Sequence, residues 1–222
     1  MEKKTYPIKN AYRFLIVILG WFAIILQLYL FMKGKSGSAF SLSLLNFFSY
    51  FTILTNILLA FGLTNSLVNP YTGWGKLFSK PSAETAVAVY IIIVGTIYYF
   101  FLMKLWNPQG LDLLADILTH KVVPILYFFY WLFFVKKGSL RWGLAIVWLI
   151  YPAVYFFYVL IRGAIDGWYP YPFADAGKLG YTKTIENGIL ILASFYSLGI
   201  LLIAVDKMIG ANRQAEESPL VE

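Results

Sequence analysis

The chain has 222 residues, of which 60% are hydrophobic and 13% are charged, and its formal net charge is +7. Soluble domains average about 45–50% apolar and about 25% charged residues, so this composition excludes a soluble enzyme and a disordered regulator. The absence of cysteine and the single histidine exclude disulfide scaffolds, thiolate metal sites and a multi-histidine metal centre. No basic run is interleaved with aromatic residues, so we expect no nucleic acid partner. We also expect that the protein uses no metal ion or organic cofactor.

Six apolar segments predict six membrane-spanning helices. Each reaches the length of about 20 residues that a bilayer crossing needs, and each is continuously apolar where a barrel strand would alternate. We therefore expect an all-α, polytopic membrane protein, a bundle of six transmembrane helices that forms a single domain over residues 1–208. A polar, mobile tail is expected over 209–222. The six predicted spans are 12–32, 44–68, 84–105, 112–135, 140–161 and 185–208.

The basic residues predict the orientation of these spans. If the N-terminus is cytoplasmic, eleven Lys and Arg residues fall in the inner connections and termini, against six in the outer ones. Only Lys121 remains, inside the fourth span. Because short cytoplasmic loops carry an excess of Lys and Arg, this bias favours both termini on the cytoplasmic side.

Polar residues gather in the first half of the second predicted span. Ser49, Thr52 and Asn56 are three and then four positions apart, so they are expected on one helix face. One interpretation is structural, because such side chains often bond to their own backbone or join helices. The other is a nucleophilic hydroxyl, with Thr52 as first candidate and Ser49 or Thr55 behind it. The Asn56 amide would then help to hold an oxyanion.

The fourth predicted span carries ionisable residues, which at membrane depth usually serve a function. Asp116 and His120 are four positions apart, so the carboxylate is expected to orient the imidazole as a general base. Pro124, one turn further on, is expected to free the carbonyl of His120 from its helical hydrogen bond. Lys121 points about 100° away from His120 around the helix. It is expected to snorkel, or to pair with Asp116 or Glu186.

The connection before the sixth span is rich in aromatic residues and proline. Trp168 and Tyr169 belong either to an interfacial aromatic belt or to a lid over a cleft that lipid reaches. Arg162 and Asp166 are four positions apart at the end of the fifth span, where they are expected to pair. Arg162 is also a candidate partner for a lipid carboxylate.

Three segments together resemble a family of bacterial six-helix membrane proteins. They are SYFTILTNILLA at 49–60, ADILTHKVVP at 115–124 and GWYPYPFADAGKLGY at 167–181. That family is similar to the eukaryotic androgen-induced and androgen-dependent TFPI-regulating proteins. Those relatives are intramembrane hydrolases of fatty acid esters of hydroxy fatty acids, and they use a threonine and a histidine.

The resemblance implies a nucleophile at Thr52, in Tyr50-Phe51-Thr52, and a base at His120. The eukaryotic pattern places a threonine directly after the histidine and a proline five residues after it. This chain has Lys121 and Pro124 instead. The resemblance thus implies an intramembrane, threonine-type hydrolase of lipid esters, with membrane lipids as partners and a fatty acid ester as substrate.

Short connections favour a bacterial plasma membrane as its location. The alternative function is a non-enzymatic membrane protein that binds or transports lipids or other small hydrophobic molecules. In that case Asp116 and His120 would form a protonation switch.

Overall fold

The computed structural model describes residues 5–217, and this part of the chain is helical without any β-strand. Six helical segments in it are long and apolar enough to cross a membrane, which confirms the predicted fold class of a multi-pass, all-α integral membrane protein. These segments are Pro7–Met32, Phe51–Val68, Pro81–Leu102, Gly110–Phe134, Leu144–Asp166 and Tyr181–Asn212. The chain divides into two compact units, Met1–Phe134 and Val135–Glu222, and each is described by itself.

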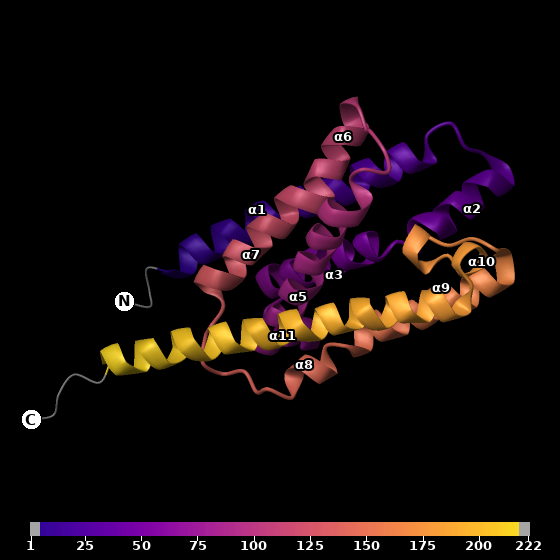
Figure 1. Cartoon of the computed structure of the whole chain (residues 1–222). Helices are drawn as coiled ribbons and strands as arrows, with labels where there is room; N and C mark the ends of the chain where they lie inside the picture. Colours follow the sequence, from indigo (N-terminus) through magenta and orange to yellow (C-terminus); the bar gives the residue numbers. More distant parts are fainter. Residues whose placement is uncertain (1–4, 218–222) are drawn as a thin grey trace, which may run out of the picture. The chain divides into compact units, whose positions relative to one another are not determined.

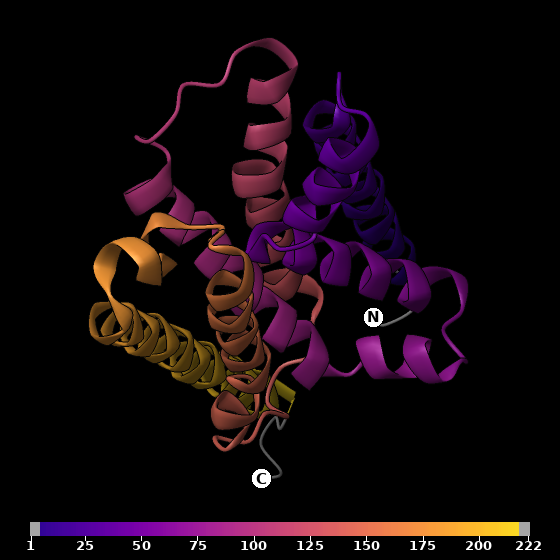
Figure 2. The same cartoon turned by 90° about the vertical axis from the view of Figure 1, so that its right-hand side faces the viewer.

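The first unit is built from seven α-helices and two π-helical turns. Within it α1 packs against α3, and α5 packs against α7. Helices α6 and α7 continue one another beside α1, as Figures 1 and 2 show. In chain order the elements are α1 (Thr5–Met32), α2 (Gly37–Phe47), α3 (Phe51–Val68), α4 (Gly73–Phe78), α5 (Pro81–Ile97), η2 (Tyr98–Leu102), α6 (Gly110–Ile117), η3 (Leu118–Val122) and α7 (Val123–Phe134).

The second unit consists mainly of two long helices that lie side by side, α9 and α11 (Figure 1). Helix α11 continues past residue 208, where the sixth span was predicted to end. The last part of the predicted tail, residues 218–222, lies outside the described residues. The elements are α8 (Leu144–Val147), α9 (Ile150–Asp166), η4 (Pro172–Ala174), α10 (Ala176–Leu179) and α11 (Tyr181–Glu217).

The second predicted span is divided into two helices, α2 and α3. Tyr50 is extended, with φ −82° and ψ 127°, and this break turns the chain between them. The turn buries the ring of Phe47, which is 1% exposed and packs with Ile24 of α1 and Ile53 of α3. Ser49 lies in the break, so the prediction that it shares a helix with Thr52 was wrong. An apolar sequence carries no local signal for such a break, because the gain comes from packing Phe47 against another helix.

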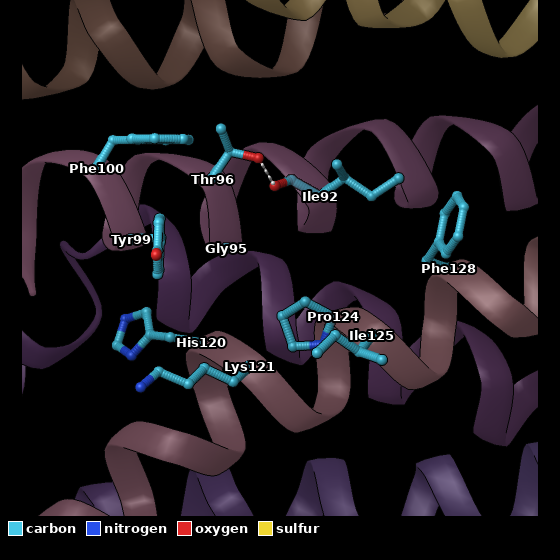
Figure 3. A pocket seen from close by; sticks show the side chains of 10 residues that line it. All are labelled: Ile92, Gly95, Thr96, Tyr99, Phe100, His120, Lys121, Pro124, Ile125 and Phe128. Atoms are coloured by element: carbon cyan, nitrogen blue, oxygen red, sulfur yellow. Dashed lines mark hydrogen bonds between the residues drawn. The ribbon is translucent and has the colours of Figure 1, made fainter.

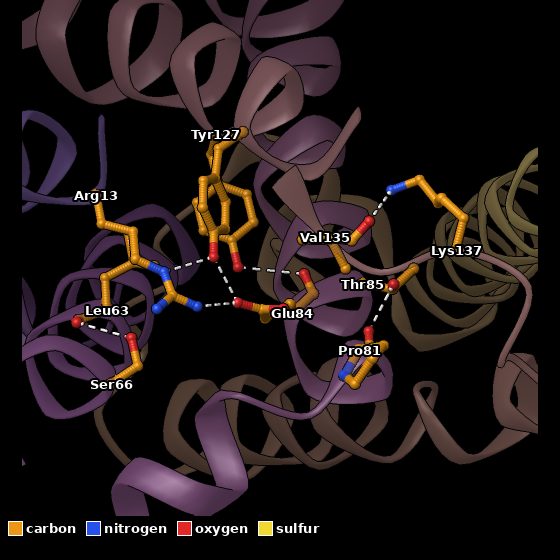
Figure 4. A network of polar contacts seen from close by, with 10 residues as sticks. Arg13, Leu63, Ser66, Pro81, Glu84, Thr85, Tyr127, Val135 and Lys137 are labelled. Atoms are coloured by element: carbon orange, nitrogen blue, oxygen red, sulfur yellow. Dashed lines mark hydrogen bonds and ion pairs between the residues drawn. The ribbon is translucent and has the colours of Figure 1, made fainter. Parts of the chain in front are cut away.

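A buried ion pair joins α1 to α5 in the first unit (Figure 4). The guanidinium of Arg13 donates to Glu84 Oε1 at 2.6 Å, and both side chains are less than a tenth exposed. Tyr130 of α7 donates to the same carboxylate, and Tyr127 donates to the Glu84 carbonyl at 3.1 Å. Because α1 and α5 begin near this network and α7 ends near it, these contacts fix three helices at one end of the unit.

Candidate functional site

The fourth membrane-spanning segment widens into a π-helical turn, η3, at its polar residues. Pro124 follows this turn and has no N–H, so the carbonyls of Thr119 and His120 lose the donor that this position would supply. The Thr119 carbonyl instead accepts a hydrogen bond at 3.3 Å from the amide Nδ2 of Asn56 on α3. Such π-helical turns are rare and occur often at functional sites.

The imidazole of His120 is held on one side by its own helix. Its Nδ1 lies 3.1 Å from the backbone carbonyl of Asp116 and 3.2 Å from the carboxylate Oδ1. The Thr119 hydroxyl lies 3.1 Å from the same nitrogen. The predicted juxtaposition of Asp116 and His120 is therefore present, with the Asp116 side chain 2% and the His120 side chain 17% exposed.

Tyr98, the first residue of the turn η2, contacts both members of this pair. Its hydroxyl donates to Asp116 Oδ2, and its ring stacks on the His120 imidazole at 4.0 Å between centroids and 15° between planes. One aromatic side chain from the third span thus fixes the carboxylate and the imidazole together. The other carboxylate oxygen, Oδ1, is buried and makes no directed hydrogen bond, so a small ring rotation would let it accept the proton on Nδ1.

These contacts determine what the imidazole can do chemically. The Nδ1 atom faces two oxygen atoms of Asp116, and these acceptors favour the tautomer that carries its hydrogen on Nδ1 and its lone pair on Nε2. Among the described residues Nε2 has no hydrogen-bond partner. An imidazole with an unpaired Nε2 and a carboxylate behind Nδ1 is arranged as a general base.

Asn56 connects the His120 turn to the predicted nucleophile. The amide nitrogen of Asn56, a fully buried residue, donates to the carbonyls of both Thr52 and Thr119, at 2.8 and 3.3 Å. Thr52 itself is 8% exposed, and its helix α3 contacts η3 directly. Since both hydrogens of the amide are directed at backbone carbonyls, Asn56 has no N–H left for an oxyanion in this arrangement. It positions the two helices, and its buried Oδ1 has no hydrogen-bond partner.

The other two candidate nucleophiles of the second predicted span, Ser49 and Thr55, are fully buried. Ser49 donates to the carbonyl of Leu45 at 2.7 Å, a local contact that completes the end of α2. Thr55 lies on α3 and is 0% exposed. Thr52 is the most accessible of the three candidate nucleophiles.

An open apolar groove of about 460 Å³ lies beside His120 (Figure 3). It runs along α5 and α7, and Figure 3 places His120 and Lys121 near one end and Phe128 near the other. Gly95 allows α5 to approach closely here, because a Cβ at this position would lie 3.1 Å from the His120 carbonyl. Among the described residues Lys121 makes no ion pair, so its predicted pairing with Asp116 is absent. Glu186, the other predicted partner, pairs with Lys183 at 3.0 Å.

Sequence reasoning missed two residues of this site. Tyr98 lies in an aromatic run in which nothing distinguishes it from Tyr99 or Phe100. Thr119 directly precedes His120, and that adjacency was the one signal that pointed to it. Both depend on which side of a helix faces a neighbour, and continuously apolar spans carry little information on that.

The remaining predicted binding residues form a cluster in the second unit. Arg162 pairs with Asp166 at 3.0 Å, as predicted, and its guanidinium lies 4.3 Å from the ring centroid of Trp168. The ring of Tyr169 packs directly over Gly163, where any side chain would collide with it. Burial raises the pKa of the Tyr169 phenol, and the neighbouring Tyr181 raises it further. The role of Arg162, Trp168 and Tyr169 in binding a lipid stays a prediction.

Over residues 5–217 no group of three or more His, Asp or Glu side chains is placed to hold a metal ion. Comparisons with protein-family models, with curated proteins and with solved structures find no significant match to this chain. The arrangement of the site is therefore the basis for its functional interpretation.

Proposed function

We propose that this chain is an intramembrane hydrolase of lipid esters, in which Thr52 is the nucleophile, His120 is the general base and Asp116 orients the imidazole. The observation that carries the proposal is the set of contacts around the His120 imidazole. Its Nδ1 faces Asp116 and Thr119, its Nε2 is unpaired among the described residues, and the residue borders an open apolar groove. An apolar groove beside a base suits an ester whose chains stay in the membrane.

The proposed reaction has two steps. In the first, Thr52 Oγ1 attacks the ester carbonyl carbon while its proton passes to His120 Nε2, and the C–O bond to the alcohol breaks as that proton passes to the leaving oxygen. In the second, water attacks the acyl-threonine and gives a proton to His120, and His120 returns that proton to Thr52 Oγ1 as the acyl C–O bond breaks and the carboxylic acid is released. Fatty acid esters of hydroxy fatty acids are the substrates that the sequence resemblance suggests. We expect the location to be a bacterial plasma membrane.

Ester hydrolysis by the purified full chain in lipid nanodiscs tests the proposal, together with labelling by a fluorophosphonate probe. We expect Thr52→Ala and His120→Ala each to lower the rate by about 100-fold or more, because each removes a group that reacts or transfers a proton. Labelling should be lost in both variants. Thr52→Ser should keep part of the hydrolysis rate and part of the labelling.

Ser66→Ala is the matched control. Ser66 is a buried hydroxyl on the same helix, bonded only to the Leu63 carbonyl, and lies about 21 Å further along α3. This variant should match the wild type in rate and in thermal unfolding. Hydrolysis that survives Thr52→Ala in folded protein would overturn the nucleophile, and Ser49→Ala and Thr55→Ala would then identify its replacement.

The second candidate function is the binding or transport of small hydrophobic molecules, with Asp116 and His120 as a protonation switch. It is favoured by the same groove and by the presence of two ionisable side chains within a membrane span. Folded wild-type protein that neither hydrolyses esters nor reacts with the probe would favour this function.

A further inference from the structure

Lys121 is a cationic side chain in an apolar place. It is the twelfth residue of the 25-residue span Gly110–Phe134, about 16 Å along the helix from its start. Lysines near helix ends extend their ammonium groups to the membrane surface, but a residue near the middle of a span is poorly placed to do so. A charge at this depth is costly unless something offsets it.

Within the described residues of the first unit, 5–134, nothing offsets this charge. Lys121 has no hydrogen bond or ion pair there, while the nearby carboxylate of Asp116 is engaged by Tyr98 and by His120. The side chain lines the apolar groove, where the hydroxyl of Thr96 is bonded to the carbonyl of Ile92 (Figure 3). The groove therefore carries a positive charge that has no counter-charge among these residues.

We infer that the groove between α5 and α7 binds a single-chain, long-chain carboxylate, with the carboxylate on the ammonium of Lys121 and the acyl chain along the apolar walls toward Phe128. One ammonium matches one carboxylate, and a charge-assisted contact is strongest where water is excluded. The volume of about 460 Å³ falls in the range of small-ligand sites, about 300–1,000 Å³. A zwitterionic phospholipid brings its own cation and gains less from Lys121.

This inference rests on the proposed function for its biological meaning, because a long-chain carboxylate is what ester hydrolysis releases. The groove beside His120 would then be a site where the acid product, or the free carboxylate of a substrate, is held. Binding is measured with a ligand that carries no ester, so its failure and the failure of hydrolysis are separate results.

The experiment measures binding of radiolabelled palmitate to the full chain in phosphatidylcholine nanodiscs. We expect Lys121→Gln to weaken binding about tenfold or more and Lys121→Arg to keep most of it, because arginine restores the charge. Hexadecanol, which has the same chain without the charge, should bind wild type and Lys121→Gln equally. Ile125→Trp should weaken binding of both molecules by filling the groove, and it should fold because Ile125 is 54% exposed.

Lys104→Gln is the control, since Lys104 is an exposed lysine beyond the end of the third span. It should leave palmitate binding unchanged. Equal palmitate affinity in wild type and Lys121→Gln would overturn the inference, as would a lack of palmitate binding to wild type. Displacement of palmitate by phosphatidylglycerol in the nanodisc, dependent on Lys121, would also overturn it and assign the groove to a membrane phospholipid.

Discussion

At the scale of single residues, Tyr98 has the most connected position in the site. Its hydroxyl and its ring act on different partners, the Asp116 carboxylate and the His120 imidazole. The Asp116–His120 pair could be predicted from the sequence because four residues make one helical turn. Tyr98 could not, because it lies 18 residues before Asp116 on another helical segment.

Tyr98→Phe separates the two contacts of this side chain. The ring stays over His120, but Asp116 Oδ2 loses its donor, so the carboxylate is held less firmly behind the imidazole. We expect kcat for ester hydrolysis to fall about tenfold, the size expected for losing one hydrogen bond to a charged group. KM and palmitate affinity should stay unchanged, since Tyr98 does not line the groove.

Tyr99→Phe is the matched control, and the steady-state kinetics of the two variants are compared. Tyr99 borders the groove and is 57% exposed. A change confined to KM in Tyr98→Phe, or an equal fall of kcat in the two variants, would contradict a positioning role for Tyr98.

At the scale of helical elements, the π-helical turn η3 determines which way His120 points. One additional residue in a turn rotates the residues that follow it by about 100° relative to a regular α-helix. Pro124 maintains the irregularity because it cannot supply the N–H that a regular helix needs at this place. The effect of the proline on the carbonyl of His120 could be predicted from the sequence. The widening of the turn could not, and neither could the hydrogen bond that the Asn56 amide donates to the Thr119 carbonyl.

Pro124→Ala tests this element. Alanine restores the missing N–H and favours a regular helix, so the variant should fold with unfolding temperature equal to or above that of wild type. We expect hydrolysis to fall about tenfold or more, because a regular helix moves His120 away from Tyr98 and the groove. Circular dichroism during heating and steady-state kinetics give the two quantities.

Pro81→Ala provides the comparison. Pro81 is the first residue of α5, where a helix needs no N–H from this position, so the change should leave the rate unaffected. If Pro124→Ala keeps wild-type activity, the π-helical turn is not what places His120.

At the scale of the whole molecule, six spans and the distribution of basic residues predict the topology. Six crossings would put both termini on the same side of the membrane, and the excess of Lys and Arg predicts that this side is the cytoplasm. The chain has no cysteine, so one introduced cysteine reports its own position without background.

Three exposed serines in connections are suited to this measurement, Ser36, Ser79 and Ser139. In intact bacterial cells we expect an impermeant maleimide to label Ser36→Cys. Ser79→Cys and Ser139→Cys should be labelled only after the membrane is opened. The cysteine-free wild type controls for background, and the reverse pattern would place the termini outside.

The sequence by itself determined the fold class, the number of spans and the Asp116–His120 pair. These follow from apolar length and from spacing within one helix, which are local properties of the chain. Only the tertiary structure decided the break at Tyr50, the position of Tyr98 over His120, the connection through Asn56 and the groove beside Lys121. Each of these depends on contacts between helices, and a uniformly apolar surface does not encode in sequence which side chain will face which neighbour.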